Sequence, residues 1–254
     1  KPDSGPAPHV AVLLMHRTSN FLSHIATREL SERGFLVLGM NPRSDNNEAA
    51  VEWEDIALDV KSGVEFLRKQ PGITKVVLFG HSGGGPTMTF YQAVAENGPA
   101  YCQGPNKLVE CGNNLAGLPR ADGMILMDAH PGNPVNVLRA INAAVVKEGD
   151  PIQLNPALDP FSSANGFNPT GPSHYSEQFQ KQYYQGQSAR MNRLIDVARE
   201  RLQKMKAGQD IYTDDDAFVI VRGLLARLME MDPAVHHATL RPRKLLKNDG
   251  TVWA

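Results

Sequence analysis

One segment constrains the fold of this chain more than any other: an apolar run that ends in glycines arranged around a single serine. Residues 75–80 have the sequence KVVLFG, and His81, Ser82 and three glycines follow. A short apolar run of this kind predicts a strand buried on both faces, and a helix is expected over residues 85–96. The pattern G-x-S-x-G therefore lies between a buried strand and a helix, which is the context in which it forms a sharp turn.

Such a turn would give Ser82 the properties of a nucleophile. Gly80 and Gly84 let neighbouring backbone pass closely, so that the serine hydroxyl projects from the carboxyl edge of the sheet. The helix N-terminus offers backbone N–H groups and a partial positive charge, which favour the oxyanion of an acyl-transfer intermediate. A phosphate-binding loop fits less well, because the segment lacks the lysine of GxxxxGK[ST] and does not match GxGxxG. A glycine-rich turn without chemistry is the other alternative.

The rest of the first half alternates between strand-like and helix-like segments. Three further apolar runs predict buried strands at residues 9–15, 35–40 and 123–128. Amphipathic spacing predicts helices over residues 21–33 and 53–67, and Gly34 is suited to end the first of them. This alternation indicates the α/β fold class, with a mostly parallel sheet and flanking helices.

The pattern changes after residue 130, where no buried strand is as clear as the first four. Helices are expected at residues 137–147, 187–206 and 214–231, and residues 151–172 are expected to form an irregular loop. Residues 218–221, with the sequence FVIV, could form a strand instead of part of the last helix.

Residues 9–132 resemble the α/β-hydrolase superfamily. The resemblance rests on the strand that ends at His16, on residues 31–38, on the elbow sequence GHSGGGP and on the strand segment GMILMDAHPG. It implies an α/β-hydrolase core over residues 1–132 and a largely helical lid over residues 133–254.

The resemblance also implies which groups would bind an oxyanion. One backbone N–H would come from Gly83, and a second from Arg17 or Thr18. In that family His-Gly often ends the strand before the first helix, so Arg17 is a departure from the pattern. His16 could support the loop by hydrogen bonding, or it could simply be a polar residue at a strand end.

The base and acid that would activate the serine are harder to find. In the family the order is serine, acid, then histidine, and the acid and histidine follow later strands that this sequence does not display. The chain is therefore expected to stop inside or just after the lid, and its start at Lys1 without a leader also suggests a processed or partial chain. Within the chain, the candidate acid is Asp128, which could instead merely order its loop. The candidate base is His237, with the alternatives His130, His174 and His236.

Composition excludes several kinds of partner. The net charge of −1 and the lack of a basic run argue against nucleic acid and anionic membranes, and the longest apolar run is too short to span a bilayer. No metal or organic cofactor is implied.

Cys102 and Cys111 lie nine positions apart, and a disulfide between them would indicate a secreted or periplasmic protein. Two unrelated thiols would fit a cytoplasmic one.

The sequence therefore predicts a serine hydrolase that acts on an ester, or a related acyl derivative, of a small and fairly apolar molecule through an acyl-Ser82 intermediate. Acyltransferase and lactonase activities use the same elbow. A non-catalytic binding protein on the same fold is the alternative from another class, and a dinucleotide-binding domain is a further one. Aromatic and sulfur-containing residues of the expected lid would line the substrate pocket, namely Phe161, Phe167, Tyr175, Tyr183, Tyr184 and Met191.

Overall fold

The computed structural model describes residues 2–3, 5–47, 51–105, 107, 110–148, 151–169, 173–209 and 218–220. The chain divides into two compact units, residues 1–133 and residues 134–254.

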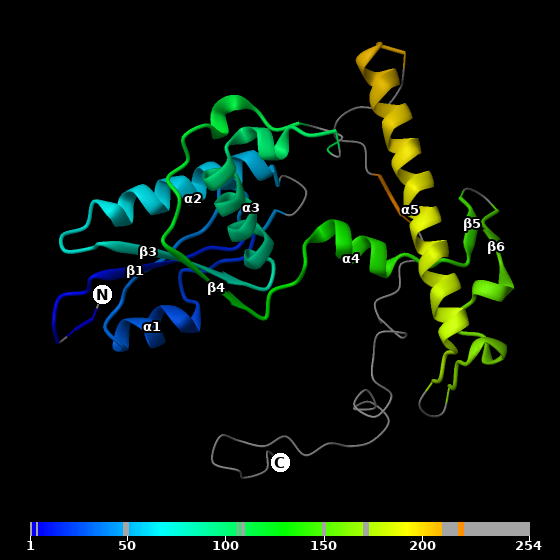
Figure 1. Ribbon diagram of the computed structural model, residues 1–254, viewed down its shortest axis with the longest axis horizontal. Helices are drawn as coiled ribbons and strands as arrows, with labels where there is room; N and C mark the ends of the chain where they lie inside the picture. The colour runs from blue at the N-terminus through cyan, green and yellow to red at the C-terminus, as the bar shows by residue number, and fades with distance from the viewer. Residues whose placement is uncertain are drawn as a thin grey trace, which may run out of the picture. The chain divides into compact units, whose positions relative to one another are not determined.

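The first unit is built on a four-stranded parallel sheet. The strands are β1 (Val10–Leu14), β2 (Leu36–Gly39), β3 (Lys75–His81) and β4 (Gly123–Met127), in the order β2-β1-β3-β4. Because all four run in one direction, their carboxyl ends lie at one edge of the sheet (Figure 1). The predicted α/β class with a parallel sheet is confirmed.

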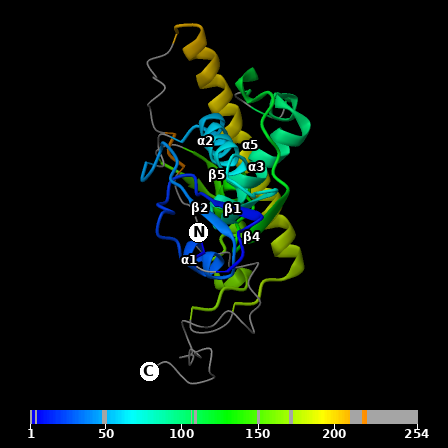
Figure 2. The same cartoon turned by 90° about the vertical axis from the view of Figure 1, so that its left-hand side faces the viewer.

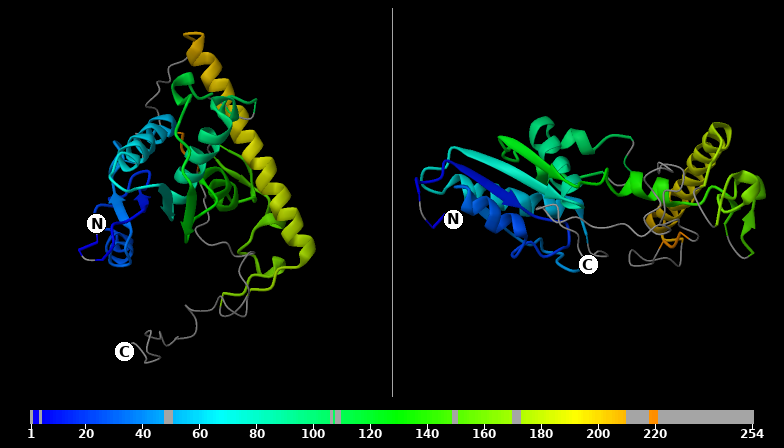
Figure 3. Two further views of the ribbon diagram at one scale, coloured as in Figure 1. Left: turned by 60° about the vertical axis from the view of Figure 1, so that its left-hand side comes forward. Right: turned by 90° about the horizontal axis from the view of Figure 1, so that it is seen from below.

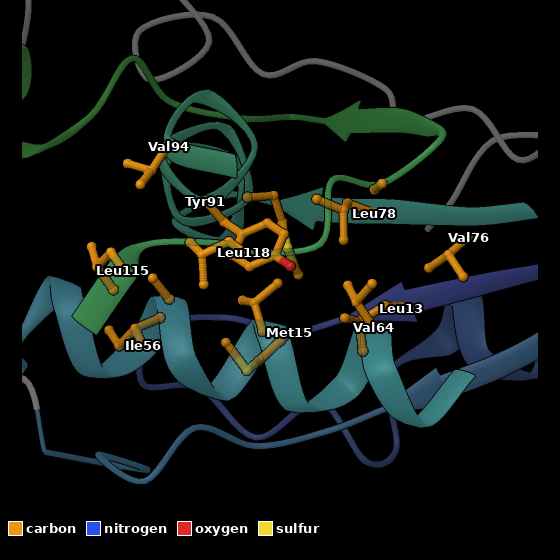
Figure 4. Packing of buried hydrophobic residues seen from close by; sticks show 14 of the residues in the cluster. Leu13, Met15, Ile56, Val64, Val76, Leu78, Tyr91, Val94, Leu115 and Leu118 are labelled. Atoms are coloured by element: carbon orange, nitrogen blue, oxygen red, sulfur yellow. The ribbon is translucent and has the colours of Figure 1, made fainter. Parts of the chain in front are cut away.

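Helices cover both faces of this sheet. Helices α2 (Trp53–Arg68) and α3 (Gly84–Asn97) lie on one face, and α1 (Ile25–Glu32) lies on the other (Figures 1 and 2). Alternate residues of β1 serve the two layers, since Leu13 packs with the core of α2 and α3 whereas Leu14 packs with the smaller cluster beside α1. In Figure 4, Leu13 and Leu78 from the strands meet Val64 and Tyr91 from the helices.

Two features of the first unit differ from the prediction, the start of α1 and the burial of β4. The first helix begins at Ile25 rather than at residue 21, because the amide of Phe21 donates to Asn41 Oδ1 in a loop that crosses the carboxyl edge. Strand β4 was expected to be buried, but it is an outer strand, and Leu126 is 52% exposed. The helix nevertheless ends as expected, with Gly34 at a φ of +94°.

A disulfide closes the excursion between α3 and β4. Cys102 and Cys111 are bonded, with their Cα atoms 5.6 Å apart, so this prediction is confirmed. Both cysteines are buried in the same core as Tyr91; Cys102 ends the one-turn helix η2 (Pro99–Cys102), and Cys111 precedes the one-turn helix η3 (Asn113–Leu115). Separately, none of the helices in the described part of the chain is long and apolar enough to cross a bilayer.

The second unit is dominated by one long helix, α5 (Glu177–Lys206), which is continuous in Figure 3. The other elements are α4 (Asn133–Ala140), the antiparallel pair β5 (Val145–Lys147) and β6 (Gln153–Leu154), and the one-turn helices η4 (Pro156–Leu158) and η5 (Ser163–Asn165).

Several expectations for this unit were wrong. The helix expected at residues 137–147 ends at Ala140, since Asn142 turns the chain by accepting the amide of Ala144, and a strand follows. Helix α5 begins ten residues earlier than expected, because Ser176 caps it by accepting the amide of Phe179. Of residues 214–231, only 218–220 lie within the described residues, and these three are in neither a helix nor a strand.

Candidate active site

The turn between β3 and α3, residues 80–85, is called the elbow below, and its backbone is strained at Ser82. The φ of Ser82 is +52°, in the left-handed region that residues with a side chain rarely occupy. Two hydrogen bonds hold it there: its amide donates to Met127 O at 3.2 Å, and its carbonyl accepts the amide of Gly85 at 3.1 Å. Ser82 is exposed, and within the described part of the chain its hydroxyl has no hydrogen-bond partner.

The glycines of the elbow are required by close backbone contacts. A Cβ on Gly80 would lie 2.7 Å from the carbonyl oxygen of Gly84, and one on Gly84 would lie 2.7 Å from the carbonyl oxygen of Met15. A Cβ on Gly85 would overlap the side chain of Ala129. The first turn of α3 is therefore packed directly on the ends of three strands, which leaves Ser82 at the apex of the turn.

The strain at Ser82 predicts which of two variants, Ser82→Gly or Ser82→Ala, is the more stable. We expect Ser82→Gly to be more stable than Ser82→Ala by about 0.5–1 kcal/mol, because glycine adopts a positive φ without penalty and this gain exceeds its entropic cost. Urea denaturation of the two variants measures the difference. The control is Ser62 in α2, where the order should reverse because glycine destabilises a helix by about 1 kcal/mol relative to alanine. An alanine variant at position 82 as stable as the glycine variant would contradict the strained turn.

The loop between β1 and α1, residues 15–24, runs beside the elbow and is locked by hydrogen bonds. His16 Nδ1 accepts the amides of Thr18, at 3.1 Å, and Ser19, at 2.9 Å. On the other side, Ser44 Oγ donates to the carbonyl of Arg17 and the amide of Asn46 donates to the carbonyl of Thr18. The Thr18 amide is thus committed to His16, which makes the amide of Arg17 the better candidate of the two for binding an oxyanion.

The side chains of this loop cover the residue that follows the serine. Gly83 is buried, and a Cβ there would overlap Arg17 Nη1 and lie 2.5 Å from His16 Nε2. Arg17 Nη1 is also 3.4 Å from His130 Nε2. A guanidinium group therefore lies against Gly83, and it adds positive charge beside the N-terminus of α3.

The candidate acid lies on the next strand at the same edge of the sheet. His81 pairs with Met127 in the β3–β4 register, so Ser82 and Asp128 are the next residues along the two strands. Asp128 also has a positive φ, +47°, and is exposed. The structure thus brings Ser82, Gly83, Arg17 and Asp128 to one edge of the sheet. His237 and His236 lie outside the described residues, and His174 belongs to the second unit.

The histidines near the elbow are not arranged to act as its base. His16 Nδ1 accepts two amides, and His130 Nδ1 accepts the amide of Gly132 at 3.1 Å. His81 Nδ1 lies 3.0 Å from His24 Nε2. The neutral His16 ring carries its proton on Nε2, because its Nδ1 accepts hydrogen bonds, so that Nε2 has no lone pair for the serine proton. His130, one of the alternatives, has both ring nitrogens engaged, Nδ1 by the amide of Gly132 and Nε2 by Arg17 Nη1 at 3.4 Å.

The residues expected to line a substrate pocket do not form one group in the second unit. Tyr183 is buried and packs against Phe179 and Ala143. Tyr175 is stacked on Phe179, whereas Tyr184 is exposed. Burial raises the pKa of the Tyr183 hydroxyl to about 12, which fits a packed residue rather than one in a solvated pocket.

The residues that shape the loop between β1 and α1 were not predicted from the sequence. Asn41, Ser44 and Asn46 fix it from the segment after β2, and His24 caps α1 by accepting the amide of Ala26. A run of small polar residues after a buried strand was a usable signal for the first three, because such residues cross the carboxyl edge of the sheet. Within the described residues, no group of three or more His, Cys, Asp or Glu side chains could hold a metal ion.

Comparison with protein-family models, with curated proteins and with solved structures finds no match for this chain. The fold and the local geometry of the elbow are therefore the observations from which a function has to be argued.

Proposed function

We propose that this protein is a serine hydrolase of the α/β-hydrolase type that cleaves a carboxylic ester, or a related acyl derivative, of a small and fairly apolar molecule. The observation that carries the proposal is the backbone of Ser82: an exposed serine with a positive φ, directly between a buried strand and a helix. Left-handed backbone costs about 1–2 kcal/mol for a residue with a side chain, and such strain clusters at functional sites.

In the proposed reaction Ser82 Oγ attacks the carbonyl carbon of the substrate. The developing oxyanion would be bound by the amide of Gly83, at the N-terminus of α3, and by the amide of Arg17. The Arg17 guanidinium, which lies against Gly83, would add to the positive potential there. The alcohol leaves, and water then hydrolyses the acyl-Ser82 ester.

The serine needs a base to take its proton, and the base needs an acid to orient it. His237 remains the candidate base of this chain and Asp128 the candidate acid. The second unit would act as the lid of the hydrolase. The disulfide supports a secreted or periplasmic location, because such bonds persist in oxidising compartments.

A fluorophosphonate probe tests the proposal directly. The probe is expected to add one phosphonyl group to Ser82, with loss of fluoride, as detected by intact-protein and peptide mass spectrometry. Ser82→Ala should lose this labelling completely, whereas Ser62→Ala, which removes an exposed hydroxyl from α2, should retain it.

The same experiment separates the enzyme from the alternative, a non-catalytic binding protein on the same fold. Binding alone needs no activated hydroxyl, so folded wild-type protein that resists the probe would argue for that alternative. Hydrolysis of short-chain aryl esters, measured on labelled and unlabelled protein, would then distinguish a hydrolase from an acyltransferase that needs a second substrate.

A further inference from the structure

Two histidines join the loop between β1 and α1 to the elbow. His24 is the last residue before α1, and His81 is the last residue of β3, directly before Ser82. His24 Nε2 lies 3.0 Å from His81 Nδ1, and the two rings meet edge to face at 5.1 Å. A side-chain hydrogen bond therefore connects the loop between β1 and α1 to the elbow.

The direction of this hydrogen bond follows from the helix cap. His24 Nδ1 accepts the amide of Ala26 at 3.2 Å, so this nitrogen carries no proton. The proton of the neutral His24 ring is then on Nε2, which donates to His81 Nδ1. His81 in turn carries its proton on Nε2. These hydrogen bonds fix both rings as neutral Nε2–H tautomers.

Aromatic rings hold the pair in place. Phe21 stacks on His24 with ring centroids 4.6 Å apart, and Phe79 meets it edge to face at 5.9 Å. Phe21 also contacts His16, at 5.6 Å, the residue that binds the amides of the same loop. The pair is thus continuous with the locked part of the loop and is not an isolated surface contact.

We propose, on the basis of the hydrolase function above, that the neutral His24–His81 hydrogen bond positions the oxyanion-binding loop against Ser82, and that a proton on either ring opens it. A second proton on His24 must go to Nδ1, where it displaces the amide of Ala26. A second proton on His81 must go to Nδ1, which faces the N–H of His24. Either proton replaces an attractive contact with a repulsive one.

Among the residues that the structure describes, the charged groups around the pair do not offset such a proton. From β3 the facing titratable group is His81 itself, and from the loop it is His16, on the far side of Phe21. On α1 the nearest charged side chains, Arg28 and Glu29, are exposed and paired with each other. The pKa of His24 is accordingly lowered, mainly by burial and also by the charge of His81.

The sign of the pH dependence follows from this lowered pKa. Below the ordinary histidine pKa of 6.5, the unfolded chain binds a proton at His24 that the folded protein resists. The contribution of the pair to stability is therefore complete above that pH and falls as the pH decreases towards the folded-state pKa. Reactivity of Ser82 should be lost over the range in which the folded pair is protonated.

The test uses His24→Asn, because asparagine is a good helix N-cap but cannot reach His81. We expect the loss of one hydrogen bond of about 1 kcal/mol to lower its thermal midpoint only slightly at pH 7.5 and to lower its rate of fluorophosphonate labelling about 5-fold. His81→Ala should give a similar fall, and the double variant should add nothing further. His9→Asn, at the other end of β1, is the matched control and should label at the wild-type rate.

Nitrogen-detected NMR of the histidine rings measures the tautomers directly, and a purely structural role of His24 would leave the state of the His81 ring unchanged. In the wild type, His24 and His81 should both be Nε2–H tautomers, and the His24 ring should titrate below 6.5. In His24→Asn, His81 should no longer be held in one tautomer. A different tautomer of either ring in the wild type, or unchanged labelling of His24→Asn, would overturn the proposal. Wild-type protein that does not label at all would overturn the hydrolase function and this positioning role together.

Discussion

Replacing Gly80 with alanine is expected to lower the free energy of unfolding of the first unit by about 3 kcal/mol, the upper part of the range for overpacked sites. The added Cβ would lie 2.7 Å from the carbonyl oxygen of Gly84 and 2.7 Å from the Cα of Gly85. Both are backbone atoms of the first turn of α3, so no flexible side chain can move away. The helix itself would have to shift from the sheet, with the loss of its packing at Met88 and Tyr91.

Urea denaturation followed by circular dichroism measures this loss, and Gly123→Ala is its matched control. Gly123 is a glycine of the adjacent strand, β4, where a new Cβ would meet only Val77 Cγ2 at 3.7 Å, an ordinary contact. We expect Gly123→Ala to change the stability by less than about 0.5 kcal/mol. Equal stabilities for the two variants would show that α3 does not press on β3 at Gly80.

Replacing Arg190 with methionine is expected to lower the free energy of local unfolding of α5, in the second unit, by about 3 kcal/mol. Arg190 is fully buried, and its Nε and Nη2 donate to the two oxygens of Glu148 at 2.7 and 3.0 Å. Its Nη1 donates to the carbonyl of Asn142 at 3.0 Å. Methionine fills a similar volume but leaves the carboxylate and the carbonyl without these donors, and breaking a buried pair in this way costs about 3–5 kcal/mol. The lower end applies because Glu148 is partly exposed.

Hydrogen exchange of the α5 amides measures this change locally. A loss of about 3 kcal/mol corresponds to exchange roughly 100-fold faster around residue 190. Arg199→Met is the control on the same helix, because the contact of Arg199 with Asp196 is exposed and 3.5 Å long, and such pairs contribute little. Arg190→Lys should recover only part of the protection, since an ammonium group cannot bind both carboxylate oxygens in parallel. Equal exchange in Arg190→Met and Arg199→Met would contradict the anchoring role.

The sheet and the elbow could be predicted from the sequence because their signals are local. Residues 76–80 are apolar because β3 is covered on both faces, and the glycines at 80, 84 and 85 are needed because the first turn of α3 packs onto strand ends. The residues at which the helices begin and end were less predictable. Phe21 continues the apolar spacing of α1, but its amide is held by Asn41 from another strand end, and no local pattern shows such a contact.

The second unit could be predicted less well because long-range contacts decide its structure. Residues 137–147 have helical spacing, yet the helix ends at Ala140 and the chain then follows α5. Gln187 Nε2 donates to the carbonyls of Arg139 and Ile141, and Arg193 donates to the carbonyl of Val145. Side chains of a distant helix thus satisfy backbone groups that a continuous helix would have satisfied itself.

By itself the sequence determined the α/β class and the position of Ser82, because apolar periodicity and a glycine pattern each act over a few residues. Its short cysteine spacing favoured the disulfide, which the structure contains. The tertiary structure decided which groups meet at the elbow. It turned the amide of Thr18 towards His16, placed Asp128 beside Ser82 across the β3–β4 register, and joined His24 to His81. The last two of these arrangements connect residues from different strand ends, and only the packing of parallel strands at one edge brings those ends together.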